Sequence, residues 1–145
     1  MRRVTRSALV PFTAEDMFAL VADIKSYPRF LPWCSSAVIE DESGDEVQAR
    51  LEVSKGPVRK TFTTRNRHSG TSKIVMDLID GPFRHLQGYW KFEALGGEGC
   101  RIELHLEFEF ASRMLGRLMD PVFNEIANTM VDAFCRRAGE LYGSR

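Results

Sequence analysis

The sequence predicts an α+β domain in which one long C-terminal helix covers a curved antiparallel sheet. Residues 101–110 alternate between apolar and polar side chains without a break, which is typical of a strand with one buried face and one face in water. Apolar residues then recur at helical spacing from Leu115 to Leu141, with polar residues on the opposite side. Upstream, strand-like segments separated by turn residues complete a sheet of about six or seven strands.

Length and composition fit a single domain over residues 1–145. Basic and acidic residues number 20 each, and this balance of charge argues against a generic polyanion binder. The three cysteines are far apart and form no Cys-x-x-Cys pair, so neither a disulfide framework nor a zinc site is expected. Since no apolar run reaches the length of about 18 residues that a membrane span needs, we expect a cytoplasmic protein, with peripheral contact to the inner membrane as an option.

The first expected elements are a strand over residues 4–10 and a helix that follows Thr13 and reaches Ile24. Thr13 is a good N-cap because its hydroxyl can accept a hydrogen bond from the first helical turn. The next segment, 26–32, contains two prolines. Proline lacks a backbone N–H and disfavours the helical conformation of the residue before it, so this segment is expected to form only a single helical turn.

Turn residues then divide the middle of the chain into strands. Gly56-Pro57 and Ser69-Gly70 mark two of the turns, and Gly96-Gly97 precedes the last strand. The expected strands span residues 36–41, 46–54, 58–68, 72–79, 86–94 and 101–110. Their short connections predict antiparallel neighbours, with the long helix packed on their buried face.

The curvature of this sheet predicts an internal cavity. A strongly twisted sheet curls, and a single helix roughly 10–12 Å across cannot fill its concave side. Such a cavity would be apolar and would suit a hydrophobic ligand. Its expected lining is Leu51, Val53, Phe62, Met76, Leu78, Trp90, Leu104, Leu106, Phe108, Phe123, Met130 and Phe134. The alternative is that these side chains interlock as an ordinary, densely packed core.

Several motifs resemble one known superfamily over nearly the whole chain. Residues 27–34 (YPRFLPWC), 80–86 (DGPFRHL), 90–92 (WKF) and 133–143 (AFCRRAGELYG) resemble the coenzyme Q-binding protein family of respiring bacteria and mitochondria. Residues 60–66 (KTFTTRN) and 7–11 (SALVP) are similar to the ribosome-association toxin branch of the same superfamily. This START-like superfamily is that of the polyketide cyclases/dehydrases and lipid transport proteins.

The resemblance implies a fold and two candidate functions. In a START-like helix-grip fold, a curved antiparallel sheet wraps the C-terminal helix and leaves a tunnel for a lipid. The quinone branch implies ubiquinone binding that supports respiration and quinone biosynthesis without catalysis. The toxin branch implies binding to the large ribosomal subunit and a block of subunit joining.

Two proline-containing segments carry candidate portal residues. Phe30, Leu31 and Trp33 lie beside Pro28 and Pro32, and Phe83 follows a Gly-Pro pair. Tryptophan favours the boundary between apolar and wet surroundings, so these residues are candidates for a portal that touches a bilayer or the quinone ring. The alternatives are a loop anchored in the core by Trp33 and an ordinary turn with one packed aromatic side chain.

A basic stretch is a candidate for a partner surface. Its candidate residues are Lys55, Arg59, Lys60, Arg65 and Arg67. No carboxylate interrupts the stretch before Asp77, whereas the acidic residues of 40–46 precede it. On a membrane these cations would attract anionic headgroups, and on a ribosome they would contact phosphates. The alternative is a solvated strand face, and no motif indicates direct RNA reading or specific DNA binding.

Catalytic and metal-binding motifs are not found. His68, His85 and His105 lack metal-ligand spacing, and the sequence contains no Gly-x-Ser-x-Gly elbow or phosphate-binding glycine loop. The wider superfamily includes cyclases, but a cyclase needs an acid or base inside the cavity and the sequence places none there. No cofactor is expected apart from ubiquinone or a similar isoprenoid lipid as a bound ligand.

These features predict a non-enzymatic protein that takes up ubiquinone in an apolar tunnel and presents it to respiratory or biosynthetic machinery. Burial of the isoprenoid tail would supply the affinity, while Arg59, Lys60 and Arg65 would steer docking. The second hypothesis is a ribosome-association toxin, which needs an exposed surface and no cavity.

Overall fold

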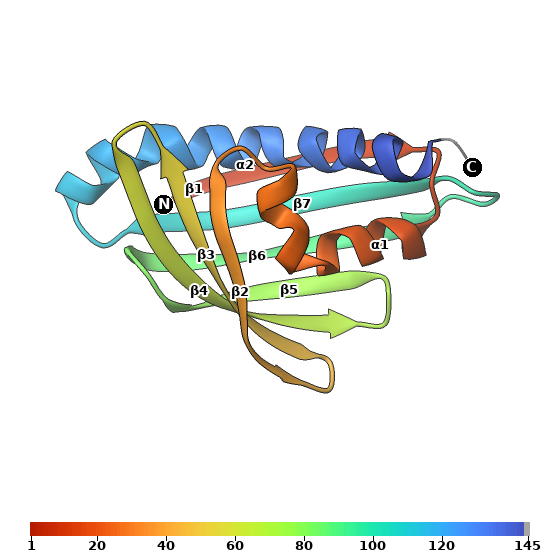
Figure 1. Ribbon diagram of the computed structural model, residues 1–145, viewed down its shortest axis with the longest axis horizontal. Helices are drawn as coiled ribbons and strands as arrows, with labels where there is room; N and C mark the ends of the chain where they lie inside the picture. The colour runs from red at the N-terminus through yellow and green to blue at the C-terminus, as the bar shows by residue number, and fades with distance from the viewer. Residues whose placement is uncertain (144–145) are drawn as a thin grey trace.

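The structure is a computed structural model that describes residues 1–143, and over this range it contains the predicted sheet and long helix (Figure 1). Its elements follow in the order β1 (Arg2–Val10), α1 (Ala14–Ala22), η1 (Ile24–Arg29), β2 (Cys34–Ser43), β3 (Glu46–Lys55), β4 (Val58–Ser69), β5 (Lys73–Asp80), β6 (Phe83–Ala94), β7 (Cys100–Phe110) and α2 (Arg113–Tyr142). The described part of the chain therefore confirms an α+β helix-grip fold.

All strands belong to one antiparallel sheet with the order β1-β7-β6-β5-β4-β3-β2. Strands β2 to β7 follow one another as a meander, and β1 closes the far edge by pairing with β7 from Arg2 opposite Phe108 to Val10 opposite Cys100. The excursion through α1 and η1 carries the chain from one edge of the sheet to the other. One consequence is that the first residues of β1 lie beside the end of β7.

The sheet is strongly curved, and β2, β3 and β4 cross steeply in front of the other strands in Figure 1. Gly88 in β6 allows one close approach, because a Cβ atom there would lie 2.3 Å from the carbonyl oxygen of His105 on β7. A register shift between Thr63 and Thr64 adds an irregularity between β4 and β5. Glycine within a strand and bulges of this kind are the usual means of bending a sheet.

Helix α2 packs along β1 and β7 and also touches α1. Ser112 caps it by accepting a hydrogen bond from the backbone N–H of Leu115 at 3.2 Å. Strand β7 alternates between buried and half-buried residues along its full length, and it presents Ile102, Leu104 and Phe108 to the core. The period-two and helical patterns therefore predicted α2 and one of the two strands on which it packs, β7. None of the helices within residues 1–143 is both long and apolar enough to cross a membrane.

Some boundaries differ from the sequence prediction. The helix expected to reach Ile24 ends at Ala22, and the following turn is the short 3-10 helix η1. Strand β6 begins at Phe83 rather than Leu86, because Phe83 pairs with Phe110 and their rings stack at 4.8 Å. Pairing with β7 thus makes Phe83 part of the strand, although the Gly-Pro pair before it predicted a turn there.

Candidate functional site

A small internal cavity lies between α2, η1 and the concave side of the sheet. Its volume is about 70 Å³, compared with roughly 300–1,000 Å³ for pockets that bury drug-sized ligands. The walls are mostly apolar, with polar atoms supplied by Tyr27, Thr64, Asn66 and Gln87. The cavity described by this structure is too small for an isoprenoid quinone, so the predicted tunnel is not open.

Most of the predicted lining residues do surround this cavity. Those in place are Leu51, Phe62, Met76, Trp90, Leu104, Leu106, Phe123 and Met130. Val53, Leu78, Phe108 and Phe134, also expected in the lining, are not among the residues that surround the cavity. Val53, Phe108 and Phe134 are at most 1% exposed and belong to the solid core. Phe108 lies 4.7 Å from the Phe123 ring and Phe134 lies 5.2 Å from the Trp90 ring (centroid to centroid), so ring packing fills the space expected to be empty.

The sequence analysis missed the polar wall of the cavity. Thr64 and Asn66 are buried on β4, and the Thr64 hydroxyl donates to Oδ1 of Asn66 at 2.9 Å. They lie on the same face of β4 as Phe62, since side chains two residues apart point the same way. Counting every second residue from Phe62 along the predicted strand could therefore have identified Thr64 and Asn66.

Burial raises the pKa of the Tyr27 phenol, which donates a hydrogen bond to the carbonyl oxygen of Val21. Among the cavity-lining side chains of residues 1–143, Tyr27 is the ionisable one. In the same part of the chain, no group of three His, Cys, Asp or Glu side chains is placed to hold a metal ion.

The predicted portal residues occupy unlike environments. Leu31 is fully buried and Phe83 is 6% exposed, so neither can touch a bilayer in this structure. Phe30 packs against Tyr27 and Phe134 at centroid distances of 6.1 and 5.2 Å. Phe83 is buried because its ring packs against those of Phe62, Phe110 and Phe123.

Trp33 is the one predicted portal residue that lies between the internal cavity and the protein surface. It lines the inner cavity and also a surface groove of about 500 Å³ formed with the β3–β4 turn and α2. At this groove an ion pair between Lys55 and Glu125 joins the turn to α2.

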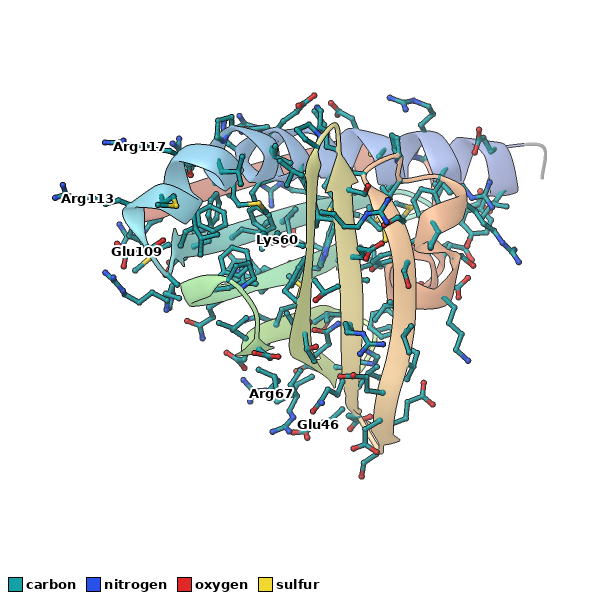
Figure 2. The ribbon with its side chains drawn as sticks, turned by 60° about the vertical axis from the view of Figure 1, so that its left-hand side comes forward. Glu46, Lys60, Arg67, Glu109, Arg113 and Arg117 are labelled. Carbon is teal, nitrogen blue, oxygen red and sulfur yellow. The ribbon has the colours of Figure 1, made fainter. Side chains whose placement is uncertain are left out.

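Ion pairs neutralise part of the predicted basic surface. Lys55 pairs with Glu125 of α2, and Arg67 pairs with Asp77 at 3.1 Å. Arg65 donates a hydrogen bond to the Gln48 side-chain oxygen at 3.4 Å. The acidic segment that precedes these residues in the chain returns beside them, and Glu46 is directly opposite Arg67 (Figure 2). The charge separation seen in the sequence is therefore partly lost in the sheet.

The predicted basic surface is also split between two faces. Lys60 is opposite the buried Val53, and directly opposed residues of an antiparallel pair share a face, so Lys60 lies on the concave side. Arg59 and Arg65 are exposed and occupy the alternate positions that face outward.

A different basic surface, which we name the corner groove, lies where β1, β6, β7 and the start of α2 meet. Its volume is about 680 Å³. Its lining comprises Met1, Arg2, Arg3, Arg84, Phe108, Glu109, Phe110, Ser112, Arg113, Gly116 and Asp120. Figure 2 shows Arg113, and Arg117 one turn later, projecting from the first turns of α2.

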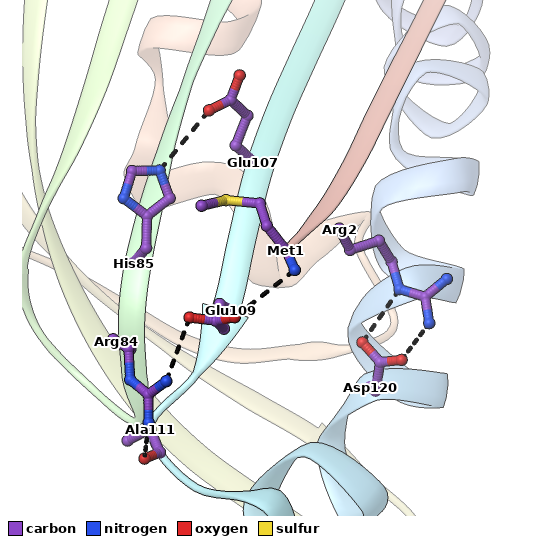
Figure 3. A network of polar contacts seen from close by, with 8 residues as sticks. All are labelled: Met1, Arg2, Arg84, His85, Glu107, Glu109, Ala111 and Asp120. Atoms are coloured by element: carbon purple, nitrogen blue, oxygen red, sulfur yellow. Dashed lines mark hydrogen bonds and ion pairs between the residues drawn. The ribbon is translucent and has the colours of Figure 1, made fainter.

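Two carboxylates, Asp120 and Glu109, orient arginines of the corner groove (Figure 3). Arg2 pairs with Asp120. Arg84 lies 3.5 Å from Oε2 of Glu109, and the amino group of Met1 lies 3.6 Å from Oε1 of the same carboxylate. Arg84 also donates to the carbonyl oxygen of Ala111 at 3.4 Å. Nearby, Glu107 accepts a hydrogen bond from His105 that lowers the pKa of its carboxyl, and it lies 3.6 Å from Arg3.

The sequence is similar to proteins of two named functions. It is 46% identical over 145 residues to the ribosome association toxin RatA of Escherichia coli K12, covering 100% of this chain and 92% of that protein. It is 30% identical over 143 residues to the mitochondrial coenzyme Q-binding protein COQ10 homolog B of Xenopus laevis, covering 96% of this chain and 59% of that protein.

The fold has a close counterpart among solved structures. A START superfamily protein from Mycobacterium smegmatis superposes with a TM-score of 0.82 at 21% identity, covering 96% of this chain and 98% of that one. Residues 10–135 match the family described as polyketide cyclase / dehydrase and lipid transport. The chain belongs to this family.

Proposed function

We propose that this protein associates with the ribosome through its outer surface and interferes with the joining of the subunits. The observation that carries the proposal is the similarity to a ribosome association toxin along the whole chain, at 46% identity. A cavity of about 70 Å³ is consistent with a function that resides on the surface. In this proposal the large subunit is the target and the protein performs no chemistry.

Sedimentation tests this function. Purified protein is mixed with isolated small and large subunits, and the gradient is read for protein position and for joined ribosomes. We expect the protein to migrate with the large subunit and the joined peak to shrink as protein is added. Intact ribosomal RNA after the incubation would separate blocked joining from RNA cleavage. Protein that stays at the top of the gradient at low salt, with the joined peak unchanged, would contradict the proposal.

A second candidate function is the binding of a quinone or a similar isoprenoid lipid. The specific observation in its favour is an apolar cavity with a polar wall at Thr64 and Asn66, separated from an outer groove by Trp33. The similarity to a coenzyme Q-binding protein points the same way. This function requires the cavity to open, since its present volume cannot hold the ligand.

Extraction tests the second candidate. Protein purified from a quinone-producing host is extracted with organic solvent, and the extract is analysed by mass spectrometry. Quinone in a stoichiometric amount would support the candidate, whereas an empty extract from folded protein would count against it. Trp33 and Ile126 line both the cavity and the groove, and Trp33→Ala, which removes the larger of the two side chains, should raise the bound amount if the lipid enters there.

A further inference from the structure

We infer that the corner groove is the surface that contacts the phosphate backbone of ribosomal RNA. The contacting residues would be Arg2, Arg3, Arg84 and Arg113 of its lining, together with Arg117 one helical turn after Arg113. The inference rests on the proposed ribosome association and adds the location of the surface and the chemistry of its partner. Nothing in the names of the related proteins assigns this surface.

The geometry of the corner groove suits an extended polyanion. Its arginines come from β1, β6 and α2, so strand and helix positions fix them around one hollow of about 680 Å³. Their side chains remain accessible, with exposed fractions of 46% for Arg2, 65% for Arg3 and 66% for Arg84. A concave surface can follow a nucleic-acid backbone, whereas contact with a bilayer favours a protruding one.

The charges of the groove leave an excess of cations. Asp120, Glu107 and Glu109 each approach an arginine, but within residues 1–143 no carboxylate lies within ion-pair distance of Arg113 or Arg117. A guanidinium has five N–H donors, so an arginine held by one carboxylate still has donors free for a phosphate. The carboxylates thus orient the arginines without using all of their donors.

The start of α2 gives a second, independent reason to expect a phosphate at the corner groove. The N-terminus of a helix carries a partial positive charge, which favours acidic residues and disfavours cations in the first turn. Here the first turn contains Arg113 and no acidic residue. A position that opposes local stability in this way is expected where function requires it, and a bound phosphate would turn the unfavourable charge into a favourable one.

The test compares three triple variants with equal loss of charge. Arg84→Gln with Arg113→Gln and Arg117→Gln changes the corner groove. Arg59→Gln with Lys60→Gln and Arg65→Gln changes the competing β4 surface. Lys25→Gln with Arg29→Gln and Arg136→Gln is the matched control. Thermal unfolding is recorded for all three, and binding to large subunits and to deproteinised large-subunit RNA is measured across a salt series.

We expect the corner-groove variant alone to lose at least about tenfold in affinity for subunits and for RNA, with the slope of log affinity against log salt reduced by about two. Three outcomes would overturn the inference while the proposed function stands. They are a loss of affinity in the β4 variant alone, an equal loss of affinity in all three variants, and unchanged affinity in all three. Binding to subunits but not to RNA would point to a ribosomal protein as the partner and overturn it too. If wild-type protein does not bind subunits, the proposed function itself fails.

A further measurement tests whether the corner groove binds a membrane instead. Met114 and Leu118 beside these arginines are 81% and 50% exposed, and exposed apolar side chains can contact a bilayer. Wild-type and corner-groove variant proteins are sedimented with phosphatidylglycerol vesicles. Vesicle binding that the variant loses, together with unchanged subunit binding, would assign the groove to lipid headgroups and overturn the inference. Little or no vesicle binding by either protein is the expected result.

Discussion

The inner cavity and the corner groove differ in size, lining and possible partners. The cavity measures about 70 Å³ and is walled mainly by apolar side chains, whereas the groove measures about 680 Å³ and is lined by arginines and carboxylates. The fold is that of lipid transport proteins, yet the larger space lies outside the core. A shared architecture therefore does not by itself assign the function to the interior.

The largest effect is expected from Phe123→Ala, which tests whether the interior is a packed core. The Phe123 ring contacts Phe62, Phe83 and Phe108. Its removal should lower the free energy of unfolding by about 3–5 kcal/mol, measured in urea, because the cavity left behind cannot fully collapse. Leu118→Ala on the exposed side of the same helix should change it by less than about 0.5 kcal/mol. A loss below about 1 kcal/mol for Phe123→Ala would show a loosely packed interior and weaken the contrast with the groove.

Gly88→Ala should lower the free energy of unfolding by about 1–3 kcal/mol, because the new methyl group would press on the β7 backbone and on Leu106. It tests whether the close approach of β6 and β7 sets the shape of the cavity wall. The control is Gly139→Ala in α2, where a Cβ atom meets nothing within 4 Å. That change should stabilise the helix by up to about 1 kcal/mol. Equal stability of wild type and Gly88→Ala would mean that the strands can separate at no cost.

Alkaline pH should act on the interior through Cys34. Burial raises the pKa of this thiol from 9.0 to about 11, so the native thiol stays protonated where the unfolded one ionises. The stabilisation is complete below about pH 9 and is lost as pH rises toward 11, by about 1 kcal/mol over the first unit. Urea unfolding at stepped pH measures this loss, and Cys34→Ala should flatten the curve. An unchanged slope in Cys34→Ala would assign the alkaline loss to other groups.

The smallest effect on stability should come from Arg113→Glu. This change should raise stability while it weakens binding. An acidic residue in the first turn of α2 interacts favourably with the helix dipole, so the free energy of unfolding should rise by about 0.3–1 kcal/mol. The same change should weaken binding to ribosomal subunits. Thermal unfolding and sedimentation measure the two quantities. A variant that loses stability and keeps full binding would remove the distinction between the corner groove and an ordinary solvated surface.

The sequence predicted those elements whose patterns are local. Alternation over residues 101–110 identified β7, and the helical stripe after it identified α2. The volume of the cavity was not predictable in this way, because it depends on how the rings of Phe108, Phe123 and Phe134 pack across elements. A list of inward positions does not say which of them touch one another.

Charge surfaces were harder to predict for a related reason. The basic stretch around β4 is continuous in sequence, yet pairing with β3 and β5 brings Glu46 and Asp77 beside Arg67. The corner groove is the reverse case. Arg2, Arg84 and Arg113 are far apart in sequence and meet because β1 and β6 both pair with β7, at the end of which α2 begins. Local sequence patterns do not indicate which distant residues lie close together in the fold.

Pro121 lies inside α2, and its ring nitrogen cannot donate to the carbonyl oxygen of Arg117. The two turns ahead of it, residues 113–118, contain no buried side chain, while Met119 just after them is 1% exposed. Amide protons of these turns should therefore exchange with deuterium much faster than those of residues 123–138. Faster exchange there would mean that the first turns of α2, which carry Arg113 and Arg117, can open locally without disturbing the core packed on residues 123–138.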